Sequence, residues 1–125
     1  MQCIINGKFV DASDKSTMNI VNPYTGKVID KVPNCTKKDA DRAVEYAKKA
    51  GESWAKVPVH QKVEILNEFL ELVKLNRDDL AKTLCKETGK PITQAYGEID
   101  NIFIAFPAFM EKAKHLYGNV IPAGT

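Results

Sequence analysis

IFIAFPAFM, residues 102–110, is the stretch that decides most about this fold. A helix formed from it has no polar face, so it must be buried on several sides. We expect this helix to span about residues 92–117, to kink at Pro107, whose ring removes one backbone donor, and to end at Gly118. The rest of the chain is too small to cover it, so more protein or another chain is expected to bury this surface.

A helix with a face of small residues is predicted further upstream. Thr36 and Asp39 fit a capping box, in which the acidic residue also suits the helix dipole. Alanines then recur at three- and four-residue steps as far as Trp54, which predicts a helix over about residues 37–55. The alanine face would let a neighbour approach closely, with Trp54 anchoring its end.

Two more helices are predicted between this helix and the apolar stretch. Pro58 opens the first of them, and its apolar stripe comprises Val63, Leu66, Leu70 and Val73. We expect Asn76 to cap the second and Gly89 to close it, because glycine readily adopts the left-handed conformation of a helix end. Pro91 then marks the start of the last helix.

The first 33 residues are predicted to form short strands and turns. Residues 2–5 and 8–10 flank Asn6-Gly7, a strong hairpin signal because both residues tolerate positive φ. Apolar residues 18–21 precede the turn sequence NPYTG, and residues 27–32 form another strand. The chain alone is therefore expected to be mostly α-helical with short N-terminal β-strands.

Composition bounds the class of protein. The chain has 125 residues, 44% hydrophobic and 27% charged, which fits one soluble globular domain. A net charge of +2 is too balanced to indicate a nucleic-acid partner. No apolar run reaches the ~18 residues of a membrane helix. The N-terminus MQCIINGKFV lacks the pattern of a signal peptide, so we expect a cytoplasmic protein.

The residues that could carry chemistry form no recognisable set. Cys3, Cys35 and Cys85 are odd in number, widely spaced and in no CxxC pair, which predicts reduced, partly buried thiols. His60 and His115 fall in terminal helix turns and are expected to be surface or structural residues. No GxGxxG, P-loop, HExxH or GxSxG pattern occurs.

Taken in order, five segments resemble one known family. They are INGKFVDA (5–12), NIVNPYTGKVIDKVP (19–33), DADRAVEYAKKAGESW (39–54), ETGKPITQAYGEID (87–100) and HLYGNVIP (115–122). Their order and spacing are similar to the start of the NAD(P)-dependent aldehyde dehydrogenase family. That start has an Asn-Gly hairpin, an Asn-Pro-x-Thr-Gly turn, an alanine-rich helix and a helix carrying Glu-x-Gly-Lys-Pro. The resemblance covers essentially all 125 residues.

The resemblance implies an α/β parent with a Rossmann-type cofactor domain, a catalytic domain and an oligomerising arm. Residues 1–125 would be the N-terminal part of the cofactor domain, with strands at 1–33 and helices at 36–118, and the other two domains absent. In the parent a Cys thiolate attacks the aldehyde, NAD or NADP takes the hydride, and a carboxylate or acyl thioester results. No catalytic or cofactor-binding residue of the family matches a position here. The chain alone is therefore expected to bind no cofactor and to be inactive.

Two finer expectations also come from the resemblance. Asn101, Ile104 and Ala105 would lie near the mouth of the substrate tunnel, and an Asn there points to a polar aldehyde; the alternative is plain core or interface positions. The Val21 carbonyl and the Glu87 carboxylate would contact a monovalent cation, although two oxygens alone are too few ligands. An ordinary carboxylate near a helix end is the alternative for Glu87.

Two other readings of the whole chain stay open. It could be a short non-catalytic module that binds a full-length subunit or a second copy through residues 102–110, or a stand-alone helical protein with a ligand between its helices. The ending IPAGT falls where the next strand of the cofactor sheet is due, which favours a truncated enzyme. On that hypothesis the rest of the subunit, or self-association, covers the apolar helix.

Overall fold

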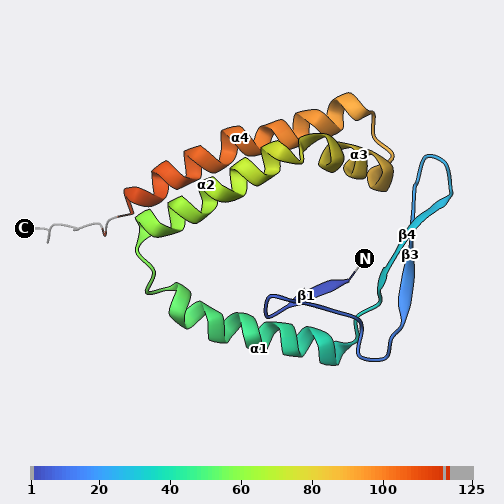
Figure 1. Ribbon diagram of the computed structural model, residues 1–125, viewed down its shortest axis with the longest axis horizontal. Helices are drawn as coiled ribbons and strands as arrows, with labels where there is room; N and C mark the ends of the chain where they lie inside the picture. Colours follow the sequence, from blue (N-terminus) through green and yellow to red (C-terminus); the bar gives the residue numbers. More distant parts are fainter. Residues whose placement is uncertain (1, 117, 119–125) are drawn as a thin grey trace, which may run out of the picture.

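The computed structural model describes residues 2–116 and 118, which are mostly helical with short N-terminal strands, as expected. The elements are β1 (Cys3–Ile5), β2 (Lys8–Val10), β3 (Thr17–Val21), β4 (Val28–Pro33), α1 (Lys37–Trp54), α2 (Val59–Leu75), α3 (Arg77–Thr88) and α4 (Ile92–Lys114). Figure 1 shows α2 and α4 side by side with α3 at one end of the pair, α1 apart from them, and the β3–β4 ribbon beyond α3.

The four strands form two separate antiparallel hairpins, of which the first is the hairpin that Asn6-Gly7 predicts. Asn6 and Gly7 join β1 to β2 with φ values of 54° and 69°, the paired positive values of a tight hairpin turn. The β3–β4 turn is held by Asn22, whose Oδ1 accepts hydrogen bonds from the backbone N–H groups of Tyr24 (2.9 Å) and Thr25 (3.0 Å). Gly26 completes this turn with φ 70°.

Helix α1 begins as predicted but lacks the neighbour that its alanine face implies. The capping box between Thr36 and Asp39 is formed in both directions. Ala40, Ala47 and Ala50 are nevertheless exposed, and α1 runs apart from the α2–α4 pair (Figure 1). Trp54 is half exposed, with Lys62 Nζ 5.2 Å above its ring. The expected close packing on this face is absent from the described residues.

The hydrophobic core lies where α2, α3 and α4 meet. It is built from Val73, Ala81, Ala95 and Ile99, with the partly buried Leu84, Tyr96 and Phe103 packed against it. Two alanines at the centre let the helices approach closely, and the branched residues fill the space around them. Of the predicted α2 stripe, Leu70 and Val73 are buried, whereas Val63 and Leu66 are half-buried.

Two predictions about helix ends are wrong. Asn76 occupies the N-cap position of α3, but its side chain donates to the Leu72 carbonyl (2.8 Å) at the end of α2 and so does not cap α3. Helix α4 ends at Lys114, earlier than expected, because the chain tightens into an i→i+3 bond from the His115 N–H to the Lys112 carbonyl (3.1 Å). Gly118 therefore lies beyond the helix, and residues 117 and 119–125 lie outside the described residues.

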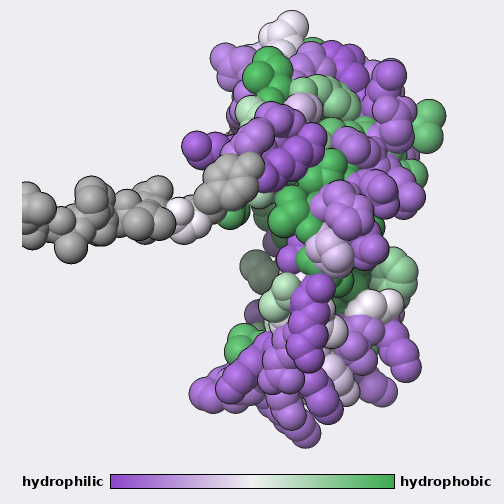
Figure 2. Space-filling view, turned by 90° about the vertical axis from the view of Figure 1, so that its left-hand side faces the viewer, coloured by the Kyte–Doolittle hydropathy of each residue, from purple (hydrophilic) through white to green (hydrophobic). Residues whose placement is uncertain are grey.

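The apolar stretch of α4 is only partly covered. Met110 is buried, but the side chains of Ile104 and Phe109 are 72% and 75% exposed. Figure 2 shows hydrophobic side chains gathered between hydrophilic ones at the end of the molecule where α2 begins. None of the helices within residues 2–116 combines the length and apolar character needed to cross a bilayer.

Candidate functional site

The tunnel-wall candidates share one exposed face of α4. Asn101, Ile104 and Ala105 are spaced i, i+3 and i+4, so they lie together on the helix surface. Asn101 and Ile104 are exposed and Ala105 is half-buried, while Phe103 on another side of the helix packs on the core. The structure thus brings the three residues together on a surface that is available to another part of the protein.

A polar clamp fixes this part of α4 to the start of α3. The Arg77 guanidinium donates from Nε to Asp100 Oδ1 (2.6 Å) and from Nη2 to Asp100 Oδ2 (2.7 Å). The same guanidinium lies 4.5 Å from the centre of the Tyr96 ring, whose hydroxyl donates to Asp78 (3.2 Å). These bonds hold the pKa of Asp100 below its ordinary value and raise that of Arg77. Asp100 precedes Asn101, so the clamp orients the candidate face.

An apolar groove runs beside the same helix, from the end of α1 across α2 to the end of α4. Its volume is about 460 Å³, and its lining includes Trp54, Val63, Leu66, Phe106 and Phe109. Phe106 also packs against Phe69, with ring centres 5.4 Å apart. Such a surface suits apolar side chains of a covering segment, since it offers few polar groups to orient a small polar ligand.

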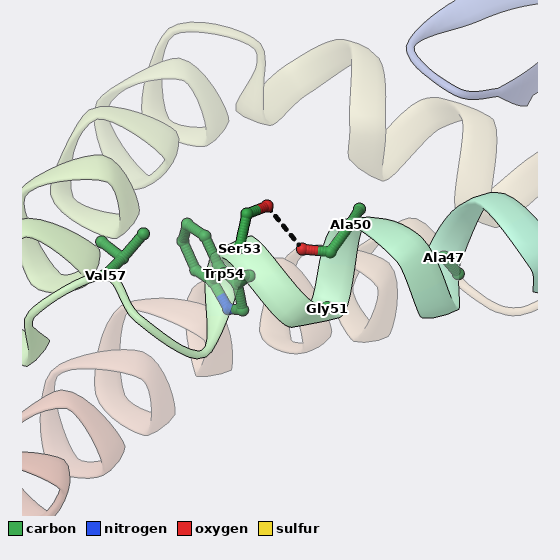
Figure 3. Close-up of a pocket in the computed structure, with 6 residues that line it drawn as sticks. All are labelled: Ala47, Ala50, Gly51, Ser53, Trp54 and Val57. Carbon is green, nitrogen blue, oxygen red and sulfur yellow. Dashed lines mark hydrogen bonds between the residues drawn. The ribbon is translucent and has the colours of Figure 1, made fainter.

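A second apolar surface lies at the end of α1. Figure 3 shows the six residues that line it, Ala47, Ala50, Gly51, Ser53, Trp54 and Val57. The Ser53 hydroxyl donates to the Ala50 carbonyl (2.9 Å), so its hydrogen is used within the helix. With small side chains along the helix, Trp54 and Val57 at its end and no charge, this surface favours close contact with another backbone over binding of a charged ligand.

The cation candidates lie near one tertiary contact. The turn that follows Val21 packs on the end of α3, where a Cβ on Gly89 would be 3.0 Å from Pro23 Cγ. Glu87 is exposed in the last turn of α3, and the register of β3 with β4 shifts next to Val21. No group of three or more acidic, His or Cys side chains able to hold a metal occurs within residues 2–116. Two oxygen donors do not enclose a cation, so further ligands would have to come from elsewhere.

The N-terminus of α1 is already occupied by a carboxylate. At α1, Asp39 Oδ2 already accepts bonds from the backbone N–H groups of Ser13 and Thr36, both at 3.0 Å, and its charge would repel a phosphate. Helices α2 and α4 start after Pro58 and Pro91. A glycine-rich turn from a parallel strand into a helix is absent from residues 2–116.

Two features of the N-terminal half were not foreseen from the sequence. Cys3 Sγ lies 3.1 Å from Cys35 Sγ, although 31 residues separate them along the chain. Asp39 is only 2% exposed, because Ser13 from the loop after β2 closes over it. The capping box was a signal for the Asp39 carboxylate, but nothing in the sequence marks Ser13 as its partner or Cys3 as the partner of Cys35. All three cysteines are free; Cys3 and Cys85 are partly buried as predicted, whereas Cys35 is exposed.

Comparison with known proteins identifies the family. The profile of the aldehyde dehydrogenase family matches residues 9–125. The chain belongs to that family. Its likeness to solved aldehyde dehydrogenases also confirms the expected fold class, a mostly helical segment of a Rossmann-type α/β protein.

Similar aldehyde dehydrogenases and related enzymes are much longer than this chain. Glutarate-semialdehyde dehydrogenase of Pseudomonas putida is 38% identical over 121 residues, which cover 97% of this chain and 25% of that protein. A double mutant of Staphylococcus aureus betaine aldehyde dehydrogenase, in complex with NAD⁺, is 30% identical with a TM-score of 0.90 over 99% of this chain and 26% of that one. An NADP-dependent enzyme of E. coli gives 0.91 with 30% identity over the same shares. The chain thus spans about a quarter of each.

Proposed function

We propose that these residues are the N-terminal part of the cofactor-binding domain of an NAD(P)-dependent aldehyde dehydrogenase. The parent would oxidise an aldehyde to a carboxylate or an acyl thioester through a cysteine thiohemiacetal. The family match over residues 9–125, together with the quarter share of the relatives' length, carries this proposal. The uncovered faces of α1 and α4 support it, because they are the surfaces that further domains would bury.

We place the catalytic cysteine, its general base and the cofactor contacts outside these residues. Cys85 donates to the Lys90 carbonyl (3.0 Å), and Cys3 and Cys35 contact each other. None of these thiols has a histidine or carboxylate as a hydrogen-bond partner in the described part of the chain. On this proposal, the segment positions an outer wall of the cofactor domain and is inactive alone.

The native gene product tests the proposal. Its mass in a cell extract, detected with an antibody against α1, is expected to be several times the 13.9 kDa of this chain. The purified product is then expected to reduce NAD⁺ or NADP⁺ when an aldehyde is added. A native product of 13.9 kDa without aldehyde-dependent reduction would contradict the proposal.

We further propose that Asn101, Ile104 and Ala105 face the aldehyde in the parent. Their shared exposed face on a clamped helix supports this role. Asn101→Leu should raise KM for aldehydes with a polar tail relative to alkyl aldehydes, because the amide is the one polar group among the three. Gln94→Leu, an exposed α4 control from the first turn, should leave the KM ratio unchanged. An unchanged ratio for Asn101→Leu would exclude the role.

We also propose that Val21 and Glu87 contribute two oxygens to a monovalent cation site in the parent. The packing of the 22–26 turn on the α3 end supports their proximity. Glu87→Gln should weaken any dependence of activity or thermal stability on K⁺ or Na⁺, since one negative ligand is lost. Lys86→Gln, the neighbouring exposed position, is the control. Identical cation dependence in Glu87→Gln and the native protein would remove Glu87 from the site.

One observation favours the alternative function, a non-catalytic interaction module. Ile104, Phe109 and Leu116 are each more than 70% exposed on or after one helix, as in a protein that docks a partner there. A 13.9 kDa native product that forms stable dimers, or co-purifies with a full-length subunit, would support this alternative over the enzyme.

A further inference from the structure

Two cysteine side chains meet between β1 and the start of α1. The sulfur atoms of Cys3 and Cys35 are 3.1 Å apart, and both thiols are free. Cys35 is exposed and Cys3 is half-buried, so a small oxidant in solvent can reach the pair. A disulfide needs the sulfurs at about 2.05 Å, so closing this gap takes a movement of about 1 Å.

Both cysteine backbones are fixed by their neighbours, so the contact is built into the fold. Cys3 pairs with Val10 across the β1–β2 hairpin. On one side of Cys35, Asn34 exchanges bonds with Ser16, from the Asn34 N–H to the Ser16 carbonyl (2.9 Å) and from the Ser16 hydroxyl to the Asn34 carbonyl (2.9 Å). On the other side, Thr36 is the N-cap of α1 and bonds to Asp39.

We propose that Cys3 and Cys35 form a reversible, oxidant-responsive disulfide that ties the first hairpin to the start of α1. Hydrogen peroxide is the oxidant class. One thiol sulfur is oxidised to a sulfenic acid, and one water is released. The other sulfur then bonds to the sulfenic sulfur, displacing its hydroxyl, which leaves as a second water with the attacking thiol's proton. Two thiols and one peroxide thus give one disulfide and two waters, and a dithiol reductant reverses the change.

The surroundings of Cys35 make its thiol slow to react with reagents in bulk solvent, because the thiolate is the reactive form, so the 3.1 Å contact with Cys3 is what favours bonding between the two. Its bond to Cys3, partial burial and the nearby Asp39 charge raise the pKa of the Cys35 thiol to about 11, while Arg42 opposes this. Cys35 therefore keeps its proton at neutral pH and stays hydrogen-bonded to Cys3. Cys85 is built differently, because its thiol is bonded to the Lys90 carbonyl, so it serves as the internal control.

Tryptic peptides separate the three cysteines cleanly. Cys3 lies in MQCIINGK (1–8), Cys35 in VPNCTK (32–37) and Cys85 in TLCK (83–86). The native gene product, at low concentration, is treated with a slight molar excess of hydrogen peroxide, alkylated and digested without reductant. We expect MQCIINGK joined to VPNCTK, with the loss of two hydrogens, while TLCK carries the alkyl label. Dithiothreitol should release both peptides, and peroxide should raise the thermal midpoint of this region by several degrees.

Serine variants of the three cysteines identify which two of them form the disulfide. Cys85→Ser should retain the cross-linked peptide at the native yield, whereas Cys3→Ser and Cys35→Ser should abolish it and lose the peroxide-induced rise in midpoint. Recovery of MQCIINGK and VPNCTK as separate peptides, alkylated or over-oxidised, would overturn the proposal. A disulfide that joins two copies of the chain, or one that includes TLCK, would overturn it as well. The native protein alone suffices for these outcomes if a variant does not fold.

Discussion

The two halves of this chain are stabilised by different kinds of interaction. In the N-terminal region, residues 2–57, the buried residues are Ile5, Ala12 and Asp39. In the helical unit, α2 to α4, they are Leu70, Val73, Ala81, Ala95, Ile99 and Met110. The helical unit thus has a hydrophobic core, whereas the N-terminal region is organised around a buried carboxylate and its hydrogen bonds.

The difference predicts which half of the chain is the more stable by itself. Burial of apolar area is the main stabilising contribution to a fold, and hydrogen bonds contribute less each. The N-terminal region leaves the alanine face of α1 exposed, so its hairpins and helix are arranged without the packing that usually fixes such a layer. We therefore expect the helical unit to be the more stable half of the 125-residue chain.

The largest effect is expected in the core of the helical unit. Ile99→Ala should lower the free energy of unfolding by about 2–4 kcal/mol, because it removes buried methyl groups and leaves a cavity. Ile104→Ala, on the exposed face of the same helix, should change it by less than ~0.5 kcal/mol in the 125-residue chain. Urea unfolding followed by far-UV circular dichroism measures both. If Ile99→Ala and Ile104→Ala lowered the free energy of unfolding equally, Ile99 would not belong to the core of the helical unit.

The N-terminal region should respond chiefly to pH and to Asp39. The hydrogen bonds from Ser13 and Thr36 hold the pKa of Asp39 well below its ordinary value of 3.8. A depressed folded pKa adds stability that is complete above that ordinary value and is lost as pH falls below it toward the folded pKa. Asp39→Asn should therefore destabilise α1 at pH 7 and flatten the loss between about pH 4 and pH 2.

Trp54 fluorescence during thermal unfolding follows this region, since Trp54 ends α1. Asp41→Asn is the matched control, because Asp41 is exposed and pairs with Lys37 (2.6 Å) across the helix surface. Its midpoint should stay close to that of the native chain. If Asp39→Asn and Asp41→Asn gave the same pH profile, the polar centre assigned to the N-terminal region would be wrong.

A smaller effect is expected where the two halves touch. Gly89 has φ 71°, and a Cβ there would lie 3.0 Å from Pro23 Cγ and 3.2 Å from the Tyr24 backbone nitrogen. Gly89→Ala should cost about 1–2 kcal/mol through strain and displacement of the β3–β4 turn. Gly97→Ala, inside α4 with open space around it, should instead stabilise by about 0.5–1 kcal/mol. Chemical denaturation of both variants gives the comparison, and a neutral Gly89→Ala would show that the turn moves freely.

The smallest effect is expected at the α3–α4 clamp. Arg77→Lys removes the bidentate ion pair with Asp100. More than a third of each side chain is exposed, however, so solvent screens the pair. The loss of stability should be less than that of Gly89→Ala and should fade with added salt. A double-mutant cycle with Asp100→Asn measures the coupling. A large coupling free energy that does not change with salt would contradict this expectation, because it would mean that solvent does not screen the Arg77–Asp100 pair.

Local structure could be predicted from the sequence wherever one residue type has a strong local preference. Asn6-Gly7, the Asn22–Gly26 turn, the Thr36 capping box and Gly89 all occupy their expected conformations. The predictions failed at Asn76 and at the end of α4, where the choice between two local hydrogen bonds is close. Helix ends differ by small energies, so neighbouring residues decide them.

The candidate sites divide in the same way. The grouping of Asn101, Ile104 and Ala105 follows from helical spacing, and their family resemblance gave them a proposed role. The meeting of Cys3 with Cys35, and of Ser13 with Asp39, had no signal in the sequence. Each of these contacts depends on how the first hairpin folds back on α1, a long-range arrangement that residue spacing does not encode.

By itself, the sequence determined the element types, the turns, the family and the presence of an apolar helix too large for the chain to bury. These follow from backbone preferences and hydrophobic periodicity, which act over a few residues. Only the tertiary structure decided which faces are covered, that Asp39 becomes the buried centre of the N-terminal half, and that two thiols 32 positions apart come within 3.1 Å. Those outcomes depend on packing between distant segments, where the free energies of many weak contacts are added together.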